Sequence, residues 1–346
     1  MNAIHLPVAR CFPPFGIAGF KPRTCALSLS AGFLLILCCL ASVASAAQFG
    51  DFTYTDQGSS ITIDAYSTSG TGFPTAGTGV VAIPSVIDGK PVTVIGGSAF
   101  QACNSLTEVT VPASVATIGA YAFSNCSLLT SVSIPSGLTE ISSGMFFNCI
   151  GLASVTIPSG VINIGANAFA GCKLLTEIAI PSGVTTIGVG AFSNCGGLSS
   201  MVVPAGVTVI PGGMFTSCSG LTSVVIQGSV TAIGNNAFQY CSKLPTLVIP
   251  GSVTSIGRSA FADCKELASI NIPASVSVIG TVSSPNIFVN CSALATITVD
   301  AANQNFSSAG GLLMNKAQSK LITCPGGVSG ALLVPSLVTA ISPSAV

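Results

Sequence analysis

The chain has 346 residues, of which 6% are charged, and its ten Lys and Arg balance its ten Asp and Glu. Three basic residues, Arg10, Lys21 and Arg23, precede residue 47, which leaves seven basic against ten acidic residues in the remainder. A chain so poor in charge has no basic surface for nucleic acid or another polyanion. The composition therefore excludes a nucleic-acid-binding protein.

Residues 1–47 have the pattern of a secretion signal. Lys21 and Arg23 precede an apolar stretch over residues 26–43, and Ala44-Ser45-Ala46 provides the small side chains that signal peptidase requires. We therefore expect a secreted or cell-surface protein. The alternative is an uncleaved membrane anchor, because the stretch approaches the roughly 18–20 residues that cross a bilayer. Since no later stretch is apolar over that length, we expect no membrane span in the mature chain.

Residues 48–80 precede the repeats. Within them, residues 52–55 and 61–65 alternate apolar and polar side chains, which is typical of half-buried strands. We predict that they form a β-hairpin that caps the first turn of the repeats.

Residues 81–299 consist of a repeat of 23 residues. A cysteine recurs at that interval eight times, and a ninth follows a four-residue insertion; each has a Phe three residues before it and a Leu three residues after it. The series is Cys103, Cys126, Cys149, Cys172, Cys195, Cys218, Cys241, Cys264 and Cys291. One copy is too small to enclose a core, so neighbouring copies must stack. The period predicts one repeat solenoid rather than several globular domains.

Each copy contains the pattern of two short strands. Val132 and Ile134 alternate with serines and predict a strand that ends at Pro135, because proline cannot donate to a continuing ladder. Leu138 and Ile141 form a second inward pair and predict another short extended segment. A glycine follows this isoleucine in most copies, where we expect a sharp turn with a positive φ. The residues from there to the cysteine suffice for one or two helical turns.

Two copies depart from this pattern in the same way. Where Ser142 or Pro211 replaces the glycine, the alanine three residues later is replaced by Met145 or Met214. We interpret the paired change as a local repacking of one corner.

The ten cysteines after residue 47 would suggest disulfides in a secreted chain. Equivalent residues on stacked turns, however, have Cβ atoms about 4.8 Å apart, beyond the roughly 3.5–4.5 Å of a disulfide. We predict a column of free, buried thiols, with cross-links as the alternative. No C-x-x-C pair follows Cys39, so we predict no metal site.

The residues that commonly perform catalysis are sparse. The one histidine, His5, lies within the expected signal, and the acidic residues are scattered singly except for Asp263 and Glu266 beside Lys265. We interpret these three as a solvated surface cluster. Without a histidine to act as a base, we predict that the chain is not an enzyme, with no catalytic, metal-binding or cofactor-binding residues.

The repeat I-P-x-x-V-T-x-I-G-x-x-A-F-x-x-C-x-x-L-x-x-V-x-I resembles the BspA-like, Treponema-type leucine-rich repeat family from about Val81 onward. Residues 300–334 resemble a longer irregular unit found between such repeats, with residues 312–314 and 321–323 on paired strands. The resemblance implies a right-handed leucine-rich-repeat coil of short parallel strands with 3-10 or short helical turns. It also implies a secreted or surface protein, and several members of the family act in adhesion to host matrix proteins or to cells.

One outward column of the first strand is apolar. Its members on successive turns are Val202, Val225 and Val248, followed by Asn271, and Ser200, Ser223, Thr246 and Ser269 lie beside them. An exposed apolar patch marks an interaction site, the alternative being that these valines merely favour strand formation. We predict that these eight residues contact a protein or surface glycan in a non-catalytic binding module for adhesion or protein-protein interaction. The alternative function is a structural surface protein whose repeats self-associate or space other domains.

Residues 335–346 begin another copy that stops at the position of the recurrent Phe. Because a solenoid needs a polar terminal cap, we expect this truncated repeat to belong to a fragment or to be followed by further repeats.

Overall fold

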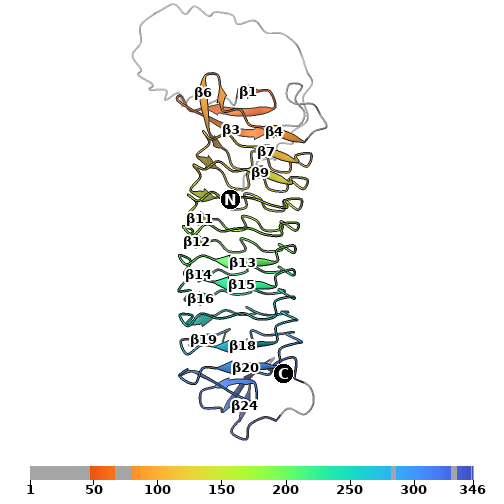
Figure 1. The fold of residues 1–346 in the computed structure, drawn as a ribbon, viewed down its shortest axis with the longest axis vertical. Coiled ribbons are helices and arrows are strands. Elements are labelled where there is room, and N and C mark those ends of the chain that lie inside the picture. The colour runs from red at the N-terminus through yellow and green to blue at the C-terminus, as the bar shows by residue number, and fades with distance from the viewer. Residues whose placement is uncertain (1–46, 67–78, 282–285, 329–332, 344, 346) are drawn as a thin grey trace, which may run out of the picture. The chain divides into compact units, whose positions relative to one another are not determined.

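The computed structural model describes residues 47–66, 79–281, 286–328, 333–343 and 345, which all belong to one compact unit, Ala44–Val346. Residues 1–46 of the expected secretion signal lie outside the described residues. In the repeats, each copy forms one turn, and the turns stack in chain order (Figure 1). We divide a turn into three sides, which in one turn are Ser200–Val203 (first side), Val209–Ile210 (second side) and residues 211–218 (third side).

The first side contains parallel strands that pair with a shift of one repeat, so that Val202 lies beside Val225. In such a strand Met201 and Val203 are buried while Ser200 and Val202 are exposed, as the alternating pattern predicts. The strands of this side are β4 (Val80–Ala82), β7 (Glu108–Thr110), β9 (Ser131–Ser133), β13 (Ser200–Val203), β15 (Ser223–Ile226), β18 (Ser269–Ile272) and β20 (Thr296–Val299).

The second side contains parallel strands, most of which are only two residues long, and each ends in a buried isoleucine. They are β6 (Lys90–Ile95), β8 (Thr117–Ile118), β10 (Glu140–Ile141), β11 (Asn163–Ile164), β12 (Thr186–Ile187), β14 (Val209–Ile210), β16 (Ala232–Ile233), β17 (Ser255–Ile256) and β19 (Val278–Ile279).

The third side is built from turns, and no helix occurs among the residues that the structure describes. The N–H groups of Tyr121, Phe123 and Asn125 donate to carbonyls of the next turn at 2.6–3.0 Å. The intervening N–H groups donate three residues back along the chain, as Ser124 does to Tyr121 at 3.0 Å. Tyr121 and Asn125 both have a positive φ, 58° and 59°, and this left-handed backbone interrupts any helix. The predicted short helical turns are therefore wrong, whereas the predicted solenoid of parallel strands is confirmed.

The glycines after the second strand serve a different purpose from the predicted one. Gly119, Gly165, Gly188, Gly234 and Gly257 do not have a positive φ. A Cβ on any of them would lie 2.3–2.5 Å from a backbone nitrogen of the preceding turn. Glycine is required at these five positions because two turns approach closely. The expectation of a positive φ is wrong for them, whereas Gly280, which follows β19 at the same position, has a φ of 61°.

Ser142 and Pro211 show what happens where this glycine is absent. The glycine N–H normally donates to the isoleucine carbonyl one turn back, as Gly188 does to Ile164 at 2.8 Å. Proline lacks that donor, and Ser142 instead donates its hydroxyl to Ile118 at 2.5 Å. At both places the strand pairing of the second side stops: β8 does not pair with β10, nor β12 with β14. Met145 and Met214 are fully buried at these two turns, in agreement with local repacking.

We expect Gly188→Ser to lower the free energy of unfolding by about 2–4 kcal/mol, because its Cβ would meet the backbone of Ala166. Ala191→Met alone would overpack a fully buried position and cost about 1–3 kcal/mol. Combining them reproduces the natural Ser142 and Met145 pair, so the double variant should be more stable than the sum of the single costs predicts. Denaturant titration of the four proteins measures this coupling, and strictly additive costs would contradict the repacking.

Two columns of side chains run through the core. The rings from Phe100 to Phe288 stack with centroids 5.1–6.1 Å apart. Beside them, each cysteine from Cys126 to Cys291 donates its thiol to the Phe carbonyl of the preceding turn at 3.0–3.3 Å. All ten cysteines of the described chain are free. The prediction of free, buried thiols is confirmed for the nine in the column.

Strands close the stack at each end of the repeats. At the beginning, β1 (Ala47–Phe49), β2 (Phe52–Asp56) and β3 (Ile61–Tyr66) pair antiparallel, and β3 joins β6, which also pairs with β5 (Val86–Ile87). The ring of Tyr66 stacks on Phe100 at 5.2 Å, so the aromatic column begins in this hairpin. After the repeats, β21 (Phe306–Ala309), β22 (Leu312–Asn315) and β23 (Lys320–Thr323) pair antiparallel, and β24 (Ala340–Ile341) pairs parallel with β23.

Candidate functional site

The valine column of the first side is exposed. Relative exposures are 45% for Val202, 49% for Val225 and 81% for Val248, and the side chain of Asn271 is also exposed. The four hydroxyl residues predicted beside the column, Ser200, Ser223, Thr246 and Ser269, are exposed as well. The structure therefore brings all eight predicted residues to one surface. Whether they bind a partner stays a prediction.

The ladder of the first side is not continuous. Residues 154–157, 177–180 and 246–249 occupy the places of strands, but no strand is formed there. Among the described residues, no backbone hydrogen bond joins 154–157 to 177–180. The next junction lies between residues 177–180 and β13. At its margin the N–H of Ser199 donates to the carbonyl of Thr176 at 3.1 Å, but the main-chain groups of 177–180 form no backbone hydrogen bond with β13. The first side is therefore opened over three successive turns.

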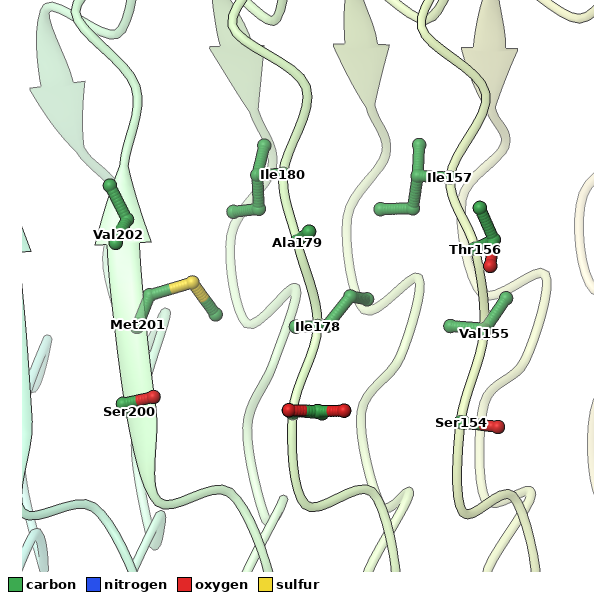
Figure 2. A pocket seen from close by; sticks show the side chains of 11 residues that line it. Ser154, Val155, Thr156, Ile157, Ile178, Ala179, Ile180, Ser200, Met201 and Val202 are labelled. Carbon is green, nitrogen blue, oxygen red and sulfur yellow. The ribbon is translucent and has the colours of Figure 1, made fainter.

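A pocket of about 540 Å³ lies at this opening (Figure 2). Its apolar residues come from three turns and include Val155, Ile157, Ile178 and Met201, which are buried. The remaining lining residues are Ser154, Thr156, Glu177, Ala179, Ile180, Ser200 and Val202. Because Ser200 and Val202 also belong to the predicted surface, the pocket continues directly into the valine column.

The sequence contains a signal for this pocket that periodicity alone does not reveal. Ala179 occupies the outward column between Thr156 and Val202, and Figure 2 shows its short side chain between theirs. It has the smallest side chain of that column on the turns between Thr110 and Thr298. A small residue on an opened ladder leaves a hollow that a valine or threonine would fill.

The opening coincides with the junction that has the fewest backbone bonds between turns. Between the turns of Cys195 and Cys218, both the first and second sides lack strand pairing. The third side still bonds there, with Gly190, Phe192 and Asn194 each donating to the next turn at 2.7–3.1 Å. The stacked rings of Phe192 and Phe215 are also the most widely spaced of the column, at 6.1 Å. We call this the weak junction.

Charged groups are rare on this surface. Glu177 is the charged residue of the pocket; it is exposed and forms no ion pair with another described residue. Elsewhere, Lys265 and Glu266 are exposed, and Asp263 accepts a hydrogen bond from Asn290 at 3.0 Å.

In the part of the chain that is described, no three His, Cys, Asp or Glu side chains are grouped to hold a metal ion. No helix there is long and apolar enough to cross a membrane.

Comparison with known proteins identifies the repeat. Residues 93–222 and 208–328 match the family described as BspA type leucine rich repeat region, in six copies. The chain belongs to this family. Its fold is similar to a leucine-rich repeat protein from Bacteroides ovatus, with a TM-score of 0.60 and 27% identity over 86% of this chain and 76% of that one. A T. pallidum leucine-rich repeat protein is 33% identical, with a TM-score of 0.50, over 56% of this BspA-type chain and 88% of its own. No curated protein matches the sequence.

Proposed function

We propose that this BspA-type protein is secreted or displayed at a cell surface and binds another protein through its first side, without catalysing a reaction. The contact serves adhesion or another protein-protein interaction. The observation that supports this most strongly is the row of exposed valines on adjacent turns, Val202, Val225 and Val248. Apolar side chains exposed in a contiguous row are a feature of interaction surfaces.

The rest of the chain supports the same function. Repeats of this family form an extended surface of stacked turns, which suits binding to a large partner. The apolar stretch over residues 26–43 supports export. The low charge of the surface removes electrostatic attraction as the main source of affinity.

Val225→Asp tests the proposal, because Val225 is in the middle of the column and half exposed. We expect the variant to fold normally and to bind at least about tenfold more weakly, since a carboxylate would be desolvated in an apolar contact. Binding is measured by surface plasmon resonance against a panel of purified extracellular-matrix proteins. Val189→Asp is the matched control, because Val189 is exposed to 60% on the third side.

Equal binding by Val225→Asp and the wild type would show that the valine column is not the contact. The alternative outcome is that the wild type binds none of the proteins and elutes as an oligomer in size-exclusion chromatography. If Val225→Asp then elutes as a monomer, the surface joins copies of this chain in a structural role.

A further inference from the structure

We propose that the pocket around Ala179 holds an aliphatic side chain of an extended peptide, and that Glu177 pairs with a lysine or arginine of the same peptide. This inference rests on the proposed function, because it specifies which part of a protein partner the first side recognises. The pocket is the specificity-determining end of the surface, and the valine column extends the contact along the stack.

The shape and floor of the pocket fit an aliphatic side chain. About 540 Å³ lies within the range of sites that enclose small ligands or side chains. The floor is made of the buried residues Val155, Ile178 and Met201, whereas Ser154, Thr156 and Ser200 place hydroxyl groups at the rim. An aliphatic group would displace water from the floor, and polar groups next to it would meet the hydroxyls.

The charge of the surface selects a basic peptide. The two outward columns of the first side run from Glu108 to Thr296 and from Thr110 to Thr298. They contain two carboxylates, Glu108 and Glu177, and no lysine or arginine. Glu177 lies at the pocket, so an acidic peptide would be repelled where an isolated basic residue would be attracted.

The opened ladder favours a peptide over a sugar. Residues 154–157 and 177–180 have main-chain N–H and C=O groups that make no backbone hydrogen bonds to one another. Peptides that lie along exposed strands are recognised by main-chain bonds, with pockets that accept alternate side chains. An extended peptide carries both the amides and the side chain that this arrangement can accept.

A random twelve-residue peptide library displayed on phage provides the probe. It is selected on the full-length protein after counter-selection on Ala179→Leu, whose larger side chain fills the pocket. We expect enriched peptides to contain a lysine or arginine within a few residues of an aliphatic residue. A synthetic peptide from this set should bind Ala179→Leu at least about tenfold more weakly, and Glu177→Gln about threefold more weakly, as for an exposed ion pair.

Two variants on the same side serve as controls. Ser133→Leu adds the same side chain to the same column outside the pocket, and Glu108→Gln removes the other carboxylate. Both should bind the peptide like the wild type. Thermal unfolding of all variants tests whether they are folded.

No enrichment over the counter-selection, acidic enriched peptides, or equal binding by Glu177→Gln would overturn the inference. Binding of neutral oligosaccharides that Ala179→Leu abolishes would overturn it too, in favour of a glycan. If Val225→Asp loses matrix binding while Ala179→Leu and Glu177→Gln keep it, the proposed function stands, but the pocket does not determine the specificity of the surface. If Val225→Asp keeps matrix binding, the proposed function fails whatever the peptides show.

Discussion

Raising the pH from about 8 to about 9.5 should remove on the order of 9 kcal/mol from the free energy of unfolding. Burial raises the pKa of Cys149, Cys195 and Cys291 to about 12 and that of Cys172, Cys218, Cys241 and Cys264 well above 9. In the unfolded chain these thiols ionise near pH 8.5. The unfolded state therefore releases protons that the folded state retains, and stability is lost as the pH rises above the unfolded pKa.

Each thiol contributes about 1.2 kcal/mol over this interval, and seven of them act together. Most folded domains have only about 5–15 kcal/mol of stability, so the chain should approach unfolding at the upper limit. The pKa of Tyr54 is raised by its hydrogen bond to Asp88, and burial raises that of Tyr66, so both tyrosines titrate above this interval. Denaturant titrations at several pH values measure the loss.

The matched control is Cys172→Ala, which removes one thiol and its hydrogen bond to Phe146. It should be less stable at neutral pH, yet its loss between the two pH values should be smaller by about 1.2 kcal/mol. Mass spectrometry after alkylation of the denatured, unreduced chain should find Cys103 to Cys291 labelled as free thiols. A stability independent of pH together with unlabelled cysteines would mean that the column is cross-linked.

The repeat period predicts most of the fold because each position of a solenoid has one environment. The spacing of Phe, Cys and Leu places all three inside, and alternation places Val202 and Val225 outside, as the structure shows. What the period could not predict is the backbone of the third side. A short Gly-to-Cys segment is compatible with a helical turn, and only the pairing between turns selects the left-handed residues such as Asn125.

The pocket and the weak junction arise where the repeat departs from its own consensus. Pro211 removes a backbone donor from the second side, which can be recognised in the sequence as a lost glycine. Ala179 leaves a hollow on the first side. The unpaired segment 177–180 has no equally plain sequence signal, because its pattern of alternating residues is the same as that of the strands. The valine column could therefore be predicted from the period. Of the pocket, the sequence marks only the small residue Ala179, and the opened ladder beside it could not be predicted.

Phe192→Ala is expected to divide unfolding into two transitions. The ring of Phe192 is fully buried and stacks on Phe169 at 5.5 Å and on Phe215 at 6.1 Å. Its removal should cost about 3–5 kcal/mol. Stability in a repeat array is the sum of the repeats and of the interfaces between neighbours, so a loss at one interface separates the parts on either side.

Phe146→Ala is the matched control. Its ring is equally buried and stacks at 5.7 and 5.5 Å, but strand pairing on the first or second side still joins its turn to each neighbour. We expect a similar loss of stability with one transition. Circular dichroism during denaturant titration counts the transitions, and hydrogen exchange should show residues before Cys195 and after Cys218 losing protection separately in Phe192→Ala. If both variants unfold in the same way, the missing bonds at the weak junction do not lower the cooperativity of unfolding between the turns on its two sides. The turns that form the pocket would then be coupled as strongly as the other turns of the solenoid.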